Sequence, residues 1–334
     1  MKKNKNKPKI SIIIVNWNGK KWLKECIDSL KYQDYEDAEI ILVDNDSSDE
    51  SIEFLENRYA SDVKIIKNKN NFGFGKANNI GVENSRGDIL FFLNNDTRFP
   101  SDLISSMVEF KNDSELNIVG PRVLDDSGVD LLHGIYIGMD FMGYPGGPTK
   151  KMFYIDGCSL MISKEDFLKL GKFDEEYFMY GEDVDLCWRA RLAGMKMGIC
   201  ENVKLTHYGG GSSEKTNNSR NHVVPVWRRY EVDKNTVRSI LKNYKIFNLL
   251  WILPIVVMQN LSESLLYFVT GSFEASKASP RALLWNVKNL GSTWAVRKDI
   301  QEQRVIGDID IFRDATFYPN KLKAFSRVGI PIFK

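Results

Sequence analysis

Residues 10–15 read Ile-Ser-Ile-Ile-Ile-Val, and the polar turn Asn-Trp-Asn-Gly follows at residues 16–19. A continuous run of β-branched residues is typical of a parallel strand that is covered on both faces. Behind the turn, apolar side chains recur with helical spacing from Trp22 to Leu30. The stretch therefore predicts a buried strand followed by a helix, which is the repeating unit of a doubly wound sheet.

The same unit recurs along the first half of the chain. A strand is expected at residues 39–43, and the capping-box spacing of Ser47 to Glu50 predicts that a helix through Leu55 follows it. Further strands are expected at 63–66, 88–93, 118–123, 152–162 and 197–207, and further helices at 76–84 and 182–193. This alternation predicts an α/β fold with a mostly parallel central sheet and helices on both faces.

The composition narrows the class of protein. Of the 334 residues, 43% are hydrophobic and 27% are charged, which is ordinary for a globular protein. A net charge of +2 is too small to predict a nucleic-acid partner across the surface. The N-terminal lysine run at residues 2–9 has no apolar stretch typical of a signal peptide, so we expect the catalytic region in the cytosol. Four cysteines in apolar contexts are expected to be buried, reduced thiols.

The pattern changes near residue 225, beyond which the periodicity is helical and predicts no strands. Residues 246–258 are nearly all apolar, but Asn248 and Pro254 interrupt them, and the run falls short of the ~20 residues that span a bilayer. We expect this region to lie on a membrane or pack on another subunit, with a buried core helix as the alternative. The predicted domains are therefore residues 1–224 and 225–334.

Three predicted strands end in unusually polar residues. Ligands of doubly wound sheets bind beyond the carboxyl ends of the strands, so these residues are candidate ligand contacts. They are Asn16 and Asn18 after the first strand, Asp44 and Asp46 after the second, and Asn95 and Asp96 after the strand at 88–93.

Asp96 is the candidate metal ligand. A carboxylate that follows a hydrophobic strand is well placed to hold a divalent cation, which often takes one or two carboxylates and completes its shell with substrate phosphates. His207 follows another strand and could supply a second ligand, although a lone histidine is more often a surface residue or a core residue.

Glu182 and Asp183 open a predicted helix, where the helix dipole keeps a carboxylate ionised. An ionised and positioned carboxylate can act as a general base. The alternative is ordinary charge at the start of a helix, with Asp185 paired to Arg189 one turn later.

A glycine-rich turn spans residues 71–79 and contains Asn71, Gly73 and Lys76. It is a poor dinucleotide fingerprint, because the third glycine is absent and the turn follows the third strand. Its glycines would still let backbone N–H groups approach a phosphate or a ribose, and Lys76 suits an anion.

Together these segments resemble glycosyltransferase family 2, which has the GT-A fold, and especially its rhamnosyltransferase-like branch. The resemblance covers about residues 9–213. The matching stretches are SIIIVNWNG, VDNDSSD, NFGFGKANN, LFFLNNDT, DGCSLMISKE, FDEEYFMYGEDVDLCWRARLAG and HYGGGSS.

The resemblance implies roles for individual residues. Asp44 would read the nucleobase, Asn16 and Asn18 would line the nucleotide pocket, and Asn71, Gly73 and Lys76 would contact nucleotide or sugar. Asp96 and His207 would hold Mg²⁺ or Mn²⁺, Asp183 would be the general base, and Glu182 would contact acceptor or donor sugar. The family's metal motif often carries two acids, whereas residues 94–96 here supply one carboxylate.

The expected function is that of an inverting glycosyltransferase in surface polysaccharide synthesis. The expected donor is a dTDP-linked deoxyhexose such as rhamnose or, second, a UDP-hexose, and the acceptor a glycan or polyprenyl-linked glycan. The resemblance implies a peripheral protein at the inner face of the cell membrane. Homo-oligomerisation is also expected as a use of the C-terminal helices. The alternatives are a sugar-phosphate nucleotidyltransferase, which would not need Glu182 and Asp183, and an inactive nucleotide-sugar-binding scaffold.

Overall fold

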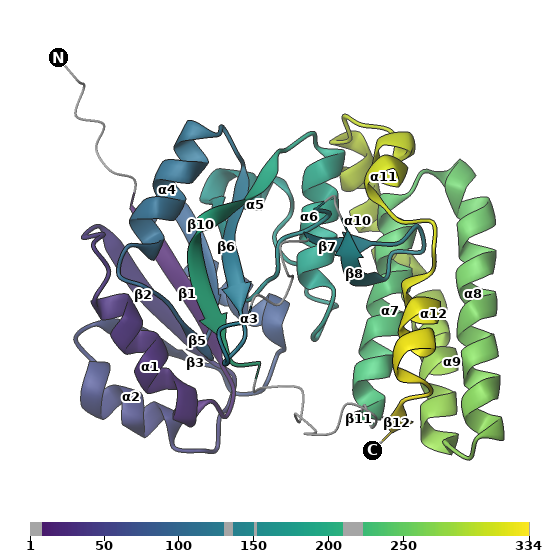
Figure 1. Ribbon diagram of the computed structural model, residues 1–334, viewed down its shortest axis with the longest axis horizontal. Coiled ribbons are helices and arrows are strands. Elements are labelled where there is room, and N and C mark those ends of the chain that lie inside the picture. The colour runs from purple at the N-terminus through teal and green to yellow at the C-terminus, as the bar shows by residue number, and fades with distance from the viewer. Residues whose placement is uncertain (1–8, 130–135, 150–151, 210–222, 334) are drawn as a thin grey trace. The chain divides into compact units, whose positions relative to one another are not determined.

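The computed structural model of the chain describes residues 9–129, 136–149, 152–209 and 223–333. These residues form two compact units (Figure 1). The first unit takes its described residues from Met1–Gly134, Ile155–Phe178 and Met195–Gly211, and the second from Ile135–Tyr154, Met179–Gly194 and Ser212–Lys334. The lysine run at residues 2–7 lies outside the described residues.

The first unit is built on an eight-stranded sheet with the order β3-β2-β1-β4-β9-β6-β10-β5. Six of the strands are parallel, while β9 and β5 run antiparallel to their neighbours. The bounds are β1 Ile10–Asn16, β2 Ala38–Asp44, β3 Val63–Lys67, β4 Ile89–Asn94, β5 Thr97–Arg98, β6 Ile118–Leu124, β9 Ser159–Ser163 and β10 Met197–His207. The expected mostly parallel α/β sheet is confirmed.

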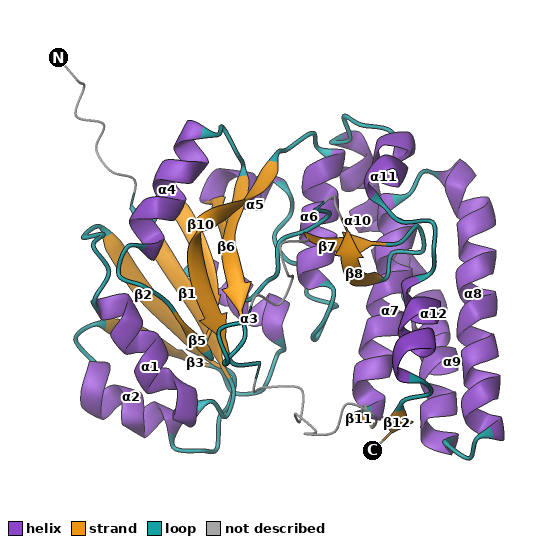
Figure 2. Ribbon diagram, viewed as in Figure 1, coloured by secondary structure: helices purple, strands orange, loops and turns teal. Residues whose placement is uncertain are grey.

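Helices cover both faces of this sheet (Figure 2). Alternate residues of β1 point to opposite faces, so Ile12 and Ile14 pack with α1, α2 and α4, whereas Ile13 lies against Gly81 of α3. The bounds of the helices are α1 Lys20–Lys31, α2 Ser51–Tyr59, α3 Phe74–Glu83, α4 Leu103–Asp113 and α5 Lys164–Lys169. The two-layer cover leaves the strand ends as the place where polar side chains gather.

Two local expectations are wrong. The strand expected from residue 152 begins only at Ser159, because Asp156 forms a turn in which its carboxylate accepts the backbone N–H of Cys158 at 2.9 Å. The capping box at Ser47 to Glu50 does not form, since α2 begins at Ser51 without a side-chain cap. The hydroxyl of Ser47 bonds instead to groups that follow β1 and β2.

The second unit is a helical bundle with a small hairpin. It contains β7 Tyr136–Met139, β8 Pro145–Thr149, α6 Glu182–Leu192, β11 Val223–Val224, α7 Val226–Asn243, α8 Ile246–Val269, α9 Phe273–Lys288, α10 Leu290–Glu302, α11 Asp308–Asp314, α12 Asn320–Val328 and β12 Ile332–Phe333. The expected C-terminal helical region is confirmed, although β12 adds a two-residue strand where none was expected. The boundary expected after residue 224 stays a prediction.

Helix α8 differs from its expected form. The apolar runs at 246–258 and 261–269 are one continuous helix of 24 residues, with Pro254 inside it. By length and composition this helix could cross a membrane, and it is the one such helix among the described residues. The expectation that the apolar segment is too short to span a bilayer is therefore wrong.

Candidate functional site

The carboxyl ends of β1, β2 and β4 are joined by a side-chain network in the first unit. The buried Asn16 donates from Nδ2 to Oδ1 of Asp44 at 2.8 Å. The amide of Asn95 donates to Oδ1 of Asn16 at 2.7 Å. These three predicted contacts therefore lie together, as the parallel register of β1 with both neighbours requires.

Ser47 completes this network, and sequence reasoning assigned it to a helix cap instead. Its hydroxyl donates to Oδ1 of Asp44 at 2.6 Å, and Nδ2 of Asn16 and the backbone N–H of Asn18 donate to it. The side chain of Asn18 accepts the backbone N–H of Ser48 at 2.7 Å. Ser47 could have been found from its place three residues after a strand-end aspartate, where a hydroxyl often bonds back to the carboxylate.

The glycine-rich turn is anchored to the same edge of the sheet. Gly73 has a φ of +80°, and a Cβ there would lie 2.1 Å from the carbonyl oxygen of Phe178, so only glycine fits. The side chain of Asn71 accepts the backbone N–H of Gly73 at 2.9 Å. The amide of the buried Asn45 donates to the carbonyl oxygen of Gly73 at 3.0 Å. The ammonium of Lys76 lies 3.4 Å from the carboxylate of Glu175.

Asp96 and His207 are brought together by the pairing of β5 with β10. Thr97 lies opposite His207 in this antiparallel pair, and Nε2 of the imidazole lies 3.1 Å from Oδ1 of Asp96. The side chain of Asn94 lies 3.3 Å from the same nitrogen. The structure thus places both predicted metal ligands side by side, with the carboxylate buried.

Tyr208 fixes the end of β10 next to this pair. Its backbone N–H donates to the carbonyl of Asp96, and its hydroxyl donates to Glu25 of α1 at 2.6 Å. Its ring stacks on Trp22 with a centroid distance of 4.8 Å and an angle of 15°. These contacts hold His207 in place from the side of α1, and sequence reasoning did not identify them.

The charge of Asp96 controls the titration of His207. Burial lowers the pKa of His207, but the hydrogen bond and the negative charge of Asp96, with the charge of Asp156, raise it by more, so the pKa lies above 6.5. A carboxylate oxygen and an imidazole nitrogen at this distance fit a divalent cation that takes two protein ligands. No group of three His, Cys, Asp or Glu side chains suited to a metal occurs in the described part of the chain, so phosphate oxygens would have to complete the shell.

The predicted base lies in the second unit, at the start of α6. Tyr180 and Gly181 have φ values of +72° and +87°, and together they turn the chain sharply into the helix. The amide of Asn235 on α7 holds this turn by donating to the carbonyls of Met179 and Tyr180 at 3.0 and 2.7 Å. Glu182 is then buried, while Asp183 is half-buried at the second position of the helix.

Two further features surround this turn. Asp185 is fully buried, and its Oδ2 lies 2.9 Å from Nε of Arg189 and 3.0 Å from Nζ of Lys242. The expected pair with Arg189 is confirmed, and Lys242 is a second partner that the sequence did not indicate. Trp227, which is 43% exposed, stacks on Tyr180 at a centroid distance of 5.7 Å. An exposed tryptophan face beside a strained turn is a second feature that sequence reasoning missed.

The structure therefore gathers most of the predicted residues in the first unit, in a network around Asn16 and a pair around Asp96. Asp46 lies exposed just beyond this network, with a φ of +63°. Glu182 and Asp183 lie together in the second unit. That they meet Asp96 in a shared site stays a prediction.

Comparison with known proteins matches residues 11–167 to the family described as glycosyl transferase family 2. Residues 143–209 match the family described as the N-terminal domain of galactosyltransferase. Among curated proteins, the chain is 25% identical over 211 residues to the low-salt glycan biosynthesis hexosyltransferase Agl10 of Haloferax volcanii, covering 59% of this chain and 66% of that one. It is 28% identical over 225 residues to the O-antigen biosynthesis protein RfbC of Myxococcus xanthus, covering 61% and 18%. The chain spans less than two thirds of the length of these relatives.

Two solved structures show the same fold. One is GalNAc-T7 with UDP, GalNAc and Mn²⁺, with a TM-score of 0.54, 18% identity and coverage of 72% of this chain and 48% of that one. The other is residues 1–349 of S. aureus TarS in complex with UDP, with a TM-score of 0.51, 16% identity and coverage of 70% and 66%. These likenesses confirm the expected GT-A type of fold.

Proposed function

We propose that this chain, whose residues 11–167 match glycosyl transferase family 2, transfers a sugar from a nucleotide diphosphate to a hydroxyl of a glycan or lipid-linked acceptor in the synthesis of a surface polysaccharide. The observation that carries the proposal is that a polar side-chain network and a carboxylate–imidazole pair lie next to each other beyond the strand ends. The network of Asn16, Asp44 and Ser47 can hold a nucleoside, and Asn95 connects it to the Asp96–His207 pair. A nucleoside and a diphosphate need these two environments next to each other.

The nucleoside end favours uracil or thymine. Both bases present an N3–H donor between two carbonyls, and a buried carboxylate such as that of Asp44 accepts such a donor. Cytosine presents an acceptor at N3 and would face the carboxylate unpaired. Asn18 and the exposed Trp17, which follow β1, would contact the base and ribose. The carboxylate therefore disfavours a CDP-sugar, and we propose a dTDP- or UDP-sugar as the donor.

The diphosphate end would lie at Asp96 and His207. These two residues would hold Mg²⁺ or Mn²⁺, which would offset the negative charge that grows on the departing diphosphate. The N-terminal turn of α3, with Gly73 and Lys76, would add backbone N–H groups and a cation to the same charge. Asn71 shapes that turn by its bond to Gly73.

The proposed chemistry is one in-line displacement. The acceptor oxygen bonds to the anomeric carbon while the bond from that carbon to the diphosphate oxygen breaks, so the configuration inverts. Asp183 takes the proton of the acceptor hydroxyl. Glu182 beside it would contact a sugar, and Trp227 stacked on Tyr180 offers an apolar face for the acceptor ring.

A lipid-linked acceptor places the enzyme at a membrane. We propose the cytosolic face, since nucleotide sugars are the donors, with attachment through the C-terminal helices and not through the first unit. Homo-oligomerisation is the competing use of the same helices.

The test is a transfer assay with a panel of nucleotide sugars, Mn²⁺ and a mixture of polyprenyl diphosphate glycans. We expect one dTDP- or UDP-sugar to raise the melting temperature of the protein and to be consumed with release of the nucleoside diphosphate. Release of pyrophosphate from a nucleoside triphosphate and a sugar phosphate would instead show a nucleotidyltransferase. Nucleotide-sugar binding without turnover on any acceptor would favour the inactive scaffold.

A further inference from the structure

Helix α8 exposes a mostly apolar side and buries a side that mixes apolar and polar residues. Its one charged residue, Glu263, is buried, together with Asn260 and Ser264. The outward stripe runs the length of the helix and contains Phe247, Leu250, Trp251, Met258, Leu261, Leu265, Leu266, Phe268 and Val269, which are 36–78% exposed. A helix that faces water normally exposes polar and charged side chains, so this exposed apolar stripe marks a surface that an apolar environment covers.

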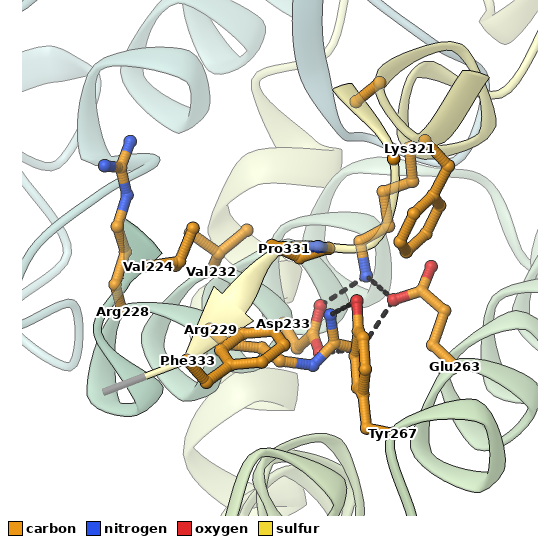
Figure 3. A pocket seen from close by; sticks show the side chains of 13 residues that line it. Val224, Arg228, Arg229, Val232, Asp233, Glu263, Tyr267, Lys321, Pro331 and Phe333 are labelled. Atoms are coloured by element: carbon orange, nitrogen blue, oxygen red, sulfur yellow. Dashed lines mark hydrogen bonds and ion pairs between the residues drawn. The ribbon is translucent and has the colours of Figure 1, made fainter. Parts of the chain in front are cut away.

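The buried side of α8 is tied to its neighbours by ion pairs. Glu263 accepts from Arg229 of α7 and lies 3.2 Å from the ammonium of Lys321 of α12, which also lies 2.6 Å from Asp233 (Figure 3). Separating these groups would leave uncompensated buried charges. Helix α8 therefore stays packed on the bundle and does not leave it to cross a bilayer alone, although its length of about 36 Å would suffice.

The helices beside α8 are basic. α8 packs beside α9 (Figure 1). It also contacts α12, through Lys321 and through the ring pair of Tyr267 with Phe325. The sequences of α8, α9 and α12 together hold six basic and two acidic residues, a net charge of +4, whereas the whole chain has +2. Lys321 is paired with Asp233 and Glu263 inside the bundle, which leaves Lys277, Arg281, Lys288, Lys323 and Arg327 for a contact outside it.

We propose that the outward stripe of α8 lies in the plane of an anionic lipid bilayer, with its apolar side chains among the acyl chains and the basic residues of α9 and α12 at the headgroups. The proposal specifies the surface for the membrane location proposed above, but it rests on the bundle and not on the transfer chemistry. A second copy of the chain is the less favoured occupant, because a symmetric contact through α8 would bring two positive flanks together.

Vesicle co-sedimentation of the full chain tests this surface without any substrate. We expect binding to vesicles of phosphatidylcholine mixed with phosphatidylglycerol and much weaker binding to phosphatidylcholine alone. The variant with Phe247→Ser, Leu250→Ser, Leu261→Ser and Leu265→Ser should lose binding about a hundredfold or more, because burying one such side chain is worth about tenfold. The control is Tyr32→Ser, Val129→Ser and Leu168→Ser, which removes three apolar groups that are 45–76% exposed on the first unit and should bind normally.

A second set of variants tests the charges. Lys277→Gln with Arg281→Gln and Lys288→Gln should weaken binding about fivefold per residue and flatten the dependence on phosphatidylglycerol. Lys24→Gln with Lys69→Gln and Lys169→Gln, which are exposed on the first unit, should change little. Circular dichroism of every variant verifies that the bundle is folded.

Three outcomes would overturn the proposal. The full chain could fail to sediment with anionic vesicles. It could instead form a dimer in gel filtration that the serine variant of α8 dissociates, which would assign the stripe to a second copy. Resistance of the bound protein to extraction by alkaline carbonate would contradict the in-plane orientation and indicate a spanning helix. None of these results depends on whether the chain transfers a sugar.

Discussion

Nε2 of His207 lies 3.1 Å from Oδ1 of Asp96, and the backbone of the next residue, Tyr208, bonds to the carbonyl of the same aspartate. Two residues from distant parts of the sequence are thus fixed to each other by both side chain and main chain. The short pairing of β5 with β10 enforces this contact. The proposed cation site depends on this contact.

Asp96→Asn should remove the dependence of donor binding on Mn²⁺, because the amide supplies no negative charge to the cation. Calorimetry with UDP and dTDP, each with Mn²⁺ and with a chelator, measures the effect. Asp102→Asn, on the exposed turn before α4, is the control. If the Asp96 variant binds nucleotide with unchanged Mn²⁺ dependence, the proposed cation site is wrong.

His207→Gln should destabilise the metal-free protein at low pH more than at high pH. The pKa of His207 is raised in the folded state, so its charge stabilises the fold below the ordinary value of 6.5, and this contribution disappears as the pH rises through the folded pKa. Urea unfolding of both proteins in a chelator, from pH 5.5 to 8.5, gives the difference. A gap that widens with rising pH would contradict the ion pair.

Asp44→Asn should weaken binding of UDP and dTDP by about 10- to 100-fold, the usual value of a hydrogen bond to a charged group. The carboxylate of Asp44 also accepts Ser47, so the variant tests the network as a whole. Competition of UDP against CDP measures the preference for uracil over cytosine, and we expect this preference to be smaller in the Asp44→Asn variant than in the parent protein. Asp37→Asn, exposed at the opposite end of β2, should leave both affinities unchanged.

Asp183→Asn should lower the transfer rate by ~10²–10⁴-fold while donor affinity and stability remain. Asp185→Asn, two residues on, should instead destabilise the fold by about 3–5 kcal/mol, because Lys242 and Arg189 would keep buried charges with no carboxylate between them. Thermal unfolding and turnover of the two variants separate the roles. Equal turnover of Asp183→Asn and the parent protein would exclude Asp183 as the base.

Asp140→Asn should make the stability of the second unit less dependent on pH. Burial raises the pKa of Asp140 to about 6 although the backbone N–H groups of Asn320, Tyr144 and Met142 and the charge of Lys321 oppose this. A raised pKa stabilises the fold below pH ~4, and this contribution of up to about 3 kcal/mol is lost as the pH rises through 6. The variant should therefore gain stability relative to the parent between pH 4 and 7 in urea unfolding. A constant difference would contradict the shift.

The sequence by itself determined the layered sheet. The run at 10–15 and the strands that resemble it are so apolar that both faces must be covered, and the structure has helices on both. Parallel strands put their carboxyl ends at one edge, so Asn16, Asp44 and Asn95 could be assigned to a common place without coordinates. Local pattern was enough because the register of neighbouring parallel strands leaves few alternatives.

Only the tertiary structure decided what long-range packing controls. Ser47 reads as a helix cap but bonds across two strand ends. The apolar run at 246–258 reads as a short segment but is part of one helix to Val269, whose buried Glu263 is paired with Arg229 and Lys321. The periodicity of a sequence shows which side chains share a helix face. It does not show which distant residue pairs with a buried charge on that face. The apolar side of α8 was visible in the sequence, whereas its outward direction follows from ion pairs that only the folded chain brings together.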